Sequence, residues 1–72
     1  MNELQYLPRN IRHYRLLAGL KQTKASKMIG ISSLWWSWIE TGRRPPSLKT
    51  LQKMCEVLNI NLTQVFEKRE LV

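Results

Sequence analysis

The spacing of apolar residues along this chain of 72 residues predicts short helices. Leu7, Ile11, Tyr14 and Ala18 recur at intervals of four, three and four residues, which places them on one stripe of a helix. Gly19 follows as a C-terminal stop signal. No run alternates apolar and polar residues with the β-branched enrichment typical of strands. The pattern therefore favours an all-α protein that begins with an amphipathic helix.

A second, shorter helix is expected from about Gln22 to Ile29. Its apolar positions are Ala25, Met28 and Ile29, which recur at helical intervals. Gly30 directly after the last of these is a second stop signal.

A third helix follows after only a short turn. Ser32 or Ser33 can cap its N-terminus, because a serine oxygen accepts a free backbone N–H there. The helix is expected to run to about Thr41 and to stop at Gly42. Two short helices around a tight, glycine-containing turn have the sequence shape of a helix-turn-helix, here at about residues 22–41.

The C-terminal part predicts two more helices after a rigid connector, the segment RRPPS, whose two prolines cannot continue a helix. Ser47 caps the fourth helix and Asn59 ends it. Its apolar stripe is Leu48, Leu51, Cys55 and Leu58, with Met54 beside it. Asn61 can cap a last short turn that carries Leu62, Val65 and Phe66. The whole chain, residues 1–72, is thus interpreted as one domain of five short helices.

Charge adds a functional direction to this picture. The chain has a net charge of +7, and residues 1–49 carry all of the excess, because residues 50–72 hold three basic and three acidic side chains. A polyanion is the natural partner of such a surface, since counterion release supplies affinity. The alternative is a basic protein without a charged partner.

Candidate chemistry for an enzyme is sparse. The single histidine, His13, is interpreted as a surface residue, and the single cysteine, Cys55, as a small core residue. There is neither a glycine-rich phosphate loop nor a spaced carboxylate pair. We therefore expect no catalysis, cofactor, metal or small-molecule substrate. Without a membrane span or signal peptide, we expect a cytoplasmic, nucleoid-associated location.

The run from Gly19 to Phe66 resembles the lambda repressor and Cro-type helix-turn-helix domain, the Xre family. The resemblance covers about residues 10–66. Its anchors are Gly19-Leu20, Gln22, Gly30-Ile31-Ser32, Ile39-Glu40, Gly42, Pro46-Ser47-Leu48 and the ending LNINLTQVF. Their joint spacing, more than any single anchor, carries the resemblance. It implies a compact five-helix lambda-repressor-like DNA-binding domain, with its third helix in the major groove.

The resemblance also implies roles for single residues. Gln22 would hold a backbone phosphate at the start of the second helix, and the loop Gly42-Arg43-Arg44 would clamp the backbone from the other side. Arg15 and Glu40 would form an ion pair between the first and third helices. The full set of expected DNA-binding residues is Lys21, Gln22, Lys24, Ser32, Ser33, Leu34, Ser37, Trp38, Arg43, Arg44 and Lys49.

Three tryptophans within four positions need separate interpretations. Trp36 shares the inward face of the third helix with Ile39, so we predict that it is core. Its large volume is expected to compensate the small Ala25. Trp35 lies between the two faces, and both partial burial and exposure remain open.

Leu34 and Trp38 fall where the resemblance places side chains that read bases. Leucine has no hydrogen-bonding group, and the indole of tryptophan has one donor. They leave thymine methyl groups and groove shape as the features that this helix can read. Ser33 and Ser37 are the polar readers beside them.

Together these observations predict a sequence-specific, double-stranded DNA-binding transcriptional regulator. A repressor is the expected role, acting as a homodimer on a dyad-symmetric operator through the helix at about residues 33–41. The alternative is a protein-interaction module on the same scaffold, antitoxin-like or a repressor partner, using the exposed Trp/Leu face. The residues assigned to either a dimer contact or the monomer core are Leu58, Ile60, Leu62, Val65, Phe66, Leu71 and Val72.

Overall fold

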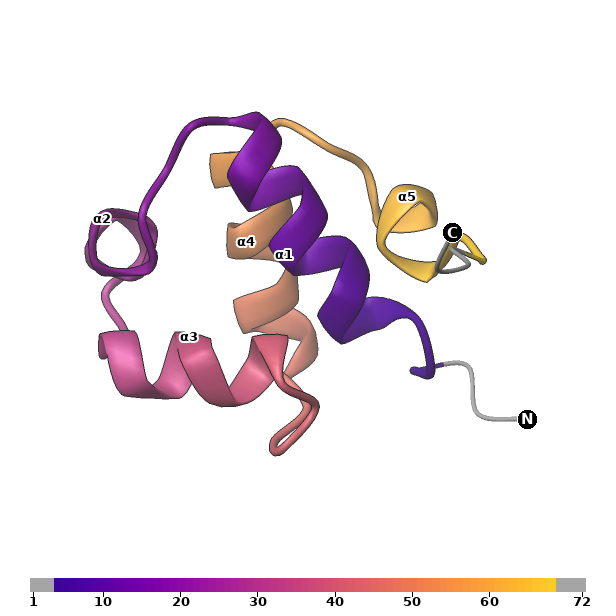
Figure 1. Ribbon diagram of the computed structural model, residues 1–72, viewed down its shortest axis with the longest axis horizontal. Helices are drawn as coiled ribbons and strands as arrows, with labels where there is room; N and C mark the ends of the chain where they lie inside the picture. Colours follow the sequence, from indigo (N-terminus) through magenta and orange to yellow (C-terminus); the bar gives the residue numbers. More distant parts are fainter. Residues whose placement is uncertain (1–3, 69–72) are drawn as a thin grey trace.

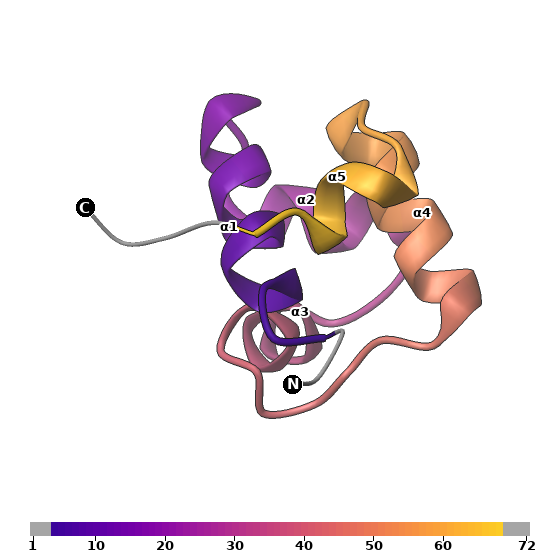
Figure 2. The ribbon, with the colours of Figure 1, turned by 90° about the vertical axis from the view of Figure 1, so that its right-hand side faces the viewer.

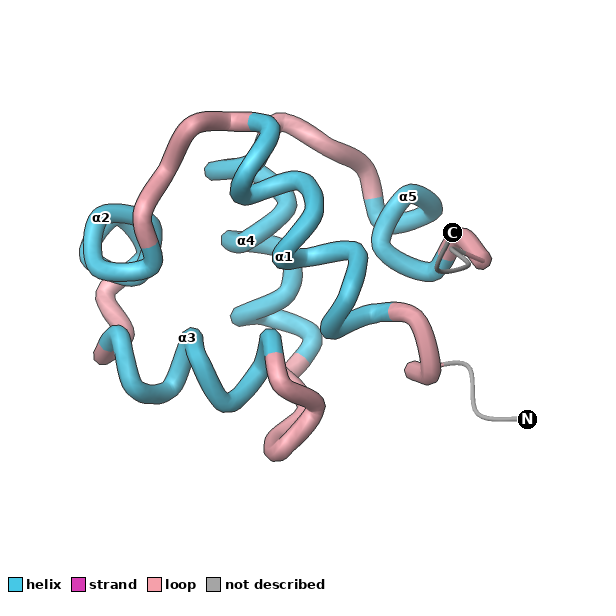
Figure 3. The backbone as a smooth tube through the Cα atoms, in the orientation of Figure 1, coloured by secondary structure: helices cyan, strands magenta, loops and turns pink. Residues whose placement is uncertain are grey.

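The computed structural model describes residues 4–68, which form five helices joined by short loops (Figure 3). The helices are α1 (Leu7–Leu17), α2 (Gln22–Ile29), α3 (Ser33–Glu40), α4 (Leu48–Leu58) and α5 (Leu62–Phe66). The predicted all-α, five-helix fold is confirmed within this range. None of these helices is both long and apolar enough to cross a membrane.

The first and fourth helices form the centre of the molecule, with α2 and α3 on one side and α5 on the other (Figure 1). α1 contacts α3, α4 and α5, while α2 contacts α3 and α4. A view turned by 90° again places α3 at the lower edge (Figure 2). One side of α3 is therefore free of the other described helices.

Side-chain caps begin the last three helices, as the sequence predicts. Ser32, Ser47 and Asn61 each accept the backbone N–H three residues later, at 3.0, 3.2 and 3.0 Å. In return, the backbone N–H of Asn61 donates to the side-chain oxygen of Gln64, at 2.8 Å. Such caps pair backbone donors that have no partner within the helix, so they set where each helix begins.

The turn between α2 and α3 depends on Gly30, whose φ of 77° lies in the left-handed region. A glycine adopts this conformation without the steric cost that a Cβ imposes. The turn is closed by the backbone N–H of Ile31, which donates to the carbonyl of Ser26 at 3.1 Å. This arrangement ends α2 and turns the chain directly into α3.

The core lies where α1, α3 and α4 meet α2 and α5. Trp36 is fully buried, and Cys55 is buried, as predicted. Ala25 is fully buried in the same cluster as Trp36. The buried apolar residues are Leu7, Ile11, Ala25, Ile29, Trp36, Ile39, Leu51, Met54, Cys55, Leu58 and Val65.

Several residues assigned to apolar stripes are exposed instead. Ala18 lies beyond the last residue of α1, where no neighbouring helix covers it. Leu48 is the first residue of α4 and is exposed there. Met28 lines an open hollow with Lys53 and Val57 between α2 and α4. An apolar stripe predicts which face of a helix is apolar. The ends and edges of that face extend beyond the neighbouring helices that cover it, so residues there are exposed.

The C-terminal apolar residues divide between core and surface. Leu58 and Val65 complete the monomer core. Leu62 and Phe66 on α5 keep more than a third of their surface exposed. Leu71 and Val72, also assigned to a dimer contact or the core, lie outside the described residues.

A buried asparagine, which the sequence did not single out, ties α5 to α1. The side-chain nitrogen of Asn10 donates to the backbone carbonyls of Val65 and Glu67, both at 2.8 Å. These carbonyls belong to the C-terminal end of α5, where intrahelical partners run out. Asn10 therefore replaces a C-terminal cap for the shortest helix.

Candidate nucleic-acid interface

α3 presents one face to the core and the opposite face to solvent. Trp36 and Ile39 are fully buried on the inward side. The residues of this helix expected to meet DNA lie elsewhere on its surface: Ser33 and Leu34 are exposed, and Ser37 and Trp38 are half-buried. Leu34 keeps 58% of its surface accessible.

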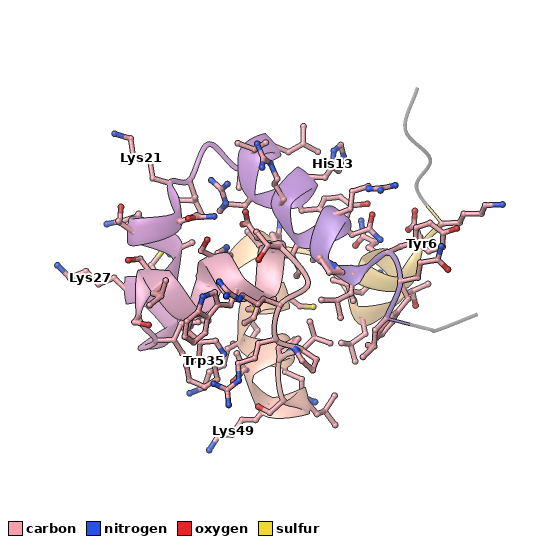
Figure 4. The ribbon with its side chains drawn as sticks, turned by 60° about the horizontal axis from the view of Figure 1, so that its bottom comes forward. Tyr6, His13, Lys21, Lys27, Trp35 and Lys49 are labelled. Carbon is pink, nitrogen blue, oxygen red and sulfur yellow. The ribbon has the colours of Figure 1, made fainter. Side chains whose placement is uncertain are left out.

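The tryptophans differ in their surroundings. Trp35, left open by the sequence, is 37% exposed. Viewed from the α3 side, it lies between Lys27 and Lys49, which point outward (Figure 4). Trp38 is half-buried, less exposed than the sequence interpretation assumed, and Arg43 and Arg44 of the loop after α3 lie beside it. The exposed apolar surface of α3 therefore consists of Leu34 and Trp35 more than of Trp38.

Glu40, at the end of α3, is the centre of a buried hydrogen-bond network. The guanidinium of Arg15 on α1 donates to both carboxylate oxygens, at 2.5 and 3.1 Å. The side-chain nitrogen of Gln22 on α2 donates at 3.0 Å, and the indole N–H of Trp36 donates at 2.5 Å. Arg15 also donates to the carbonyl of Leu20, at 2.7 Å. The network joins α1, α2 and α3 and fixes the rotation of α3 about its axis.

This network lowers the pKa of the Glu40 carboxyl. Burial alone raises its pKa, but hydrogen bonds from Arg15, Trp36 and Gln22 and the positive charge of Arg15 outweigh that effect. Glu40 is therefore ionised at neutral pH, and its charge is compensated within the protein. The negative charge of Glu40 therefore does not reduce the positive charge of the basic surface around α3.

Gln22 has a partner that the sequence interpretation did not foresee. Its side-chain nitrogen donates to Glu40, and the residue itself is half-buried. The phosphate contact of Gln22 stays a prediction, and the backbone N–H groups of the first turn of α2, which have no intrahelical acceptors, offer further donors at the same place.

The loop after α3 forms a hollow beside Trp38. The carbonyl of Trp38 accepts the backbone N–H groups of Arg43 and Arg44, at 2.9 and 3.3 Å. These three residues line an open hollow of about 330 Å³. Two exposed arginines thus lie beside Trp38 at the C-terminal end of α3.

Exposed basic side chains lie on three segments around α3: the helix α2, the loop after α3 and the start of α4. In Figure 4, Lys21, Lys27 and Lys49 extend from the rim of the molecule. Within residues 21–49 the one acidic residue is Glu40, which is paired. The exposed basic residues are Lys21, Lys24, Lys27, Arg43, Arg44 and Lys49. The sequence interpretation omitted Lys27, which its position on α2 could have indicated.

The remaining chemistry-bearing residues lie apart from this surface. Cys55 is buried in α4, and burial raises the pKa of its thiol. His13 packs edge-on against Tyr14, with ring centroids 5.0 Å apart. Among residues 4–68, no three His, Cys, Asp or Glu side chains are grouped so that they could hold a metal ion.

Known proteins resemble this chain in sequence. Residues 7–65 match the helix-turn-helix domain family. The HTH-type transcriptional regulator YazB of Bacillus subtilis strain 168 is 36% identical over 63 residues, which are 88% of this chain and 91% of that protein. The ImmF control region 10 kDa protein of Bacillus phage phi105 is 44% identical over 43 residues. That match covers 60% of this chain and 48% of the phage protein.

The family match spans α1 to α4 and all but the last residue of α5. It includes the turn at Gly30, the outward face of α3 and the network at Glu40. Five helices in this order agree with the lambda repressor and Cro type of domain that the sequence resembles. The chain belongs to the helix-turn-helix domain family.

Proposed function

We propose that this protein is a transcriptional regulator that binds double-stranded DNA through α3, as a repressor. The observation that carries the proposal is the position of α3 at an edge of the molecule, with an uncovered face and exposed basic groups on both flanks. An α-helix with its side chains is about 10–12 Å in diameter and fits into the major groove, which is about 12 Å wide. The names of the two relatives, a transcriptional regulator and a phage control region protein, support this proposal.

The two flanks would hold the DNA backbone on either side of the groove. Lys21 and Lys24, with the first turn of α2, would bind phosphates of one strand. Arg43, Arg44 and Lys49 would bind phosphates of the other. Ser32, whose oxygen caps α3, lies with Ser33 at the end of the helix that enters the groove.

We further propose that two copies bind together to a dyad-symmetric site. One short recognition helix covers only a few base pairs, and specific binding by such motifs uses two helices about 34 Å apart. Leu62 and Phe66, partly exposed on α5, are candidates for the contact between copies. Sedimentation that detects only monomers, both free and on DNA, would argue against the dimer.

The function can be tested by selecting bound DNA from a random double-stranded pool at about 100 mM salt. We expect an enriched inverted repeat with half-sites about 10 base pairs apart. The double variant Arg43→Gln/Arg44→Gln should lower affinity for all sequences. It should also flatten the slope of log K against log salt by about 1 for each phosphate that the variant no longer binds.

Lys53→Gln is the matched control, because Lys53 is also exposed but lines the hollow between α2 and α4. It should leave both affinity and slope nearly unchanged. If no DNA is retained at any salt concentration, the exposed Leu34 and Trp35 favour the second candidate, a protein-interaction module on this scaffold. Binding without an enriched motif would contradict the sequence-specific part of the proposal.

A further inference from the structure

The outward face of α3 lacks the side chains that most often read bases. Bidentate readout of guanine uses arginine or lysine, and readout of adenine uses asparagine or glutamine. None of these occurs between residues 33 and 40. The hydroxyl of Thr41, one residue beyond, already donates to the carbonyl of Ser37 at 3.0 Å. Hydrogen bonding therefore offers this helix little discrimination.

Leu34 is instead the most exposed of the large apolar side chains of this helix. It is 58% exposed, while Trp36 and Ile39 fill the core without it. Packing within the described chain therefore does not account for a leucine at this position. An apolar side chain held outward on a rigid helix is suited to bind another apolar group.

The charge around α3 indicates which kind of partner carries that apolar group. Lys21, Lys24, Arg43 and Arg44 flank the helix and favour a polyanion over an apolar protein surface. The major groove of DNA displays one apolar substituent on its bases, the C5-methyl group of thymine. The apolar face and the basic flanks are thus complementary to the same partner.

We infer that α3 reads the C5-methyl groups of pyrimidines, with Leu34 as the principal contact. The inference rests on the proposed function and specifies what the site recognises. Trp38 offers a second apolar surface one turn further along, where it lines the hollow with Arg43 and Arg44. The arginines would hold phosphates while the indole edge meets a neighbouring methyl group.

The test replaces single thymines in the selected operator with deoxyuridine, which removes only the methyl group. Burial of one such group corresponds to about a fourfold change in affinity. We expect a loss of about this size at one or two thymines in each half-site. Thymines outside the half-sites should tolerate the same replacement without loss. Fluorescence anisotropy with duplexes that differ at one base measures the ratio.

The variant Leu34→Ser assigns the methyl contact to one residue. It should bind the thymine operator less tightly and show no difference between thymine and uracil at the position that Leu34 contacts. Leu17→Ser is the matched control, because Leu17 is 70% exposed at the end of α1. It should retain the full preference for thymine. Thermal melts establish that both variants fold.

A second substitution separates the methyl group from the other features of the thymine base. At a contacted position, 5-methylcytosine opposite guanine should bind about fourfold more tightly than cytosine opposite guanine. Equal thymine preference in the wild type and Leu34→Ser would overturn the inference, as would an operator indifferent to all methyl groups. Failure to select any operator would instead refute the proposed function.

Discussion

The two faces of α3 carry similar apolar side chains in opposite surroundings. Trp36 and Ile39 are fully buried on one face, and Leu34 and Trp35 are exposed on the other. Composition alone does not separate them, because apolar residues occupy five of the eight positions in this helix. What separates them is the network at Glu40, which fixes the side of the helix that faces α1 and α2. Apolar side chains of this helix are therefore buried on one face and, under the proposed function, recognise DNA on the other.

The largest expected effect comes from removing the side chain that defines the inward face. Trp36→Ala should destabilise the domain by about 5 kcal/mol, the upper end for a buried aromatic residue, because it also removes a hydrogen bond to Glu40. Small domains have total stabilities of about 5–15 kcal/mol, so the variant should be largely unfolded. Circular dichroism with urea titration measures the change. A midpoint close to that of the wild type would contradict the assignment of Trp36 to the core.

The next effect concerns the network that orients α3. Glu40→Gln should cost about 3 kcal/mol near neutral pH, because it leaves the buried guanidinium of Arg15 without its counter-charge. The exposed Glu56 on α4 offers a control, and Glu56→Gln should change stability little. Urea titrations of both variants at neutral pH provide the comparison.

The same substitution should also change the pH dependence. The pKa of Glu40 is lowered in the folded protein, so its stabilisation is fully present above the ordinary value of 4.5. That stabilisation is lost as the pH falls through the lowered pKa. The difference in unfolding free energy between wild type and Glu40→Gln should therefore shrink below pH 4.5. A difference that stays constant with pH would show that the carboxylate charge contributes nothing.

The helix bounds were predictable because local signals set them. Serine and asparagine caps, and the left-handed Gly30 and Asn59, act within a few residues of the chain. The exposures of Met28 and Leu48 were not predictable, since a stripe does not say where its packing partners end. Local chemistry thus located the elements more reliably than it located their surfaces.

Partners distant in sequence explain what was missed at the site. Gln22 was interpreted as a phosphate ligand, which stays a prediction, and its bond to Glu40, eighteen residues away, was not foreseen. Asn10 was passed over, although it holds carbonyls 55 and 57 residues away. The partner of an amide side chain depends on how helices cross, which periodicity alone does not specify. The pairing of Arg15 with Glu40 was predicted from the family resemblance, because the resemblance implies how the first and third helices pack.

The smallest expected effect sharpens the contrast between the faces of α3. Leu34→Ala should change the unfolding free energy by no more than about 0.5 kcal/mol, because the side chain is 58% exposed and outside the core. Ile39→Ala, five residues along the same helix and fully buried, should cost about 2–5 kcal/mol. Urea titrations of both variants, fitted with a common dependence of unfolding free energy on urea concentration, give the two changes in unfolding free energy. If Leu34→Ala were as costly as Ile39→Ala, Leu34 would be a structural residue and unsuited to recognition. A near-neutral Leu34→Ala would instead show that the outward face can change without loss of the fold.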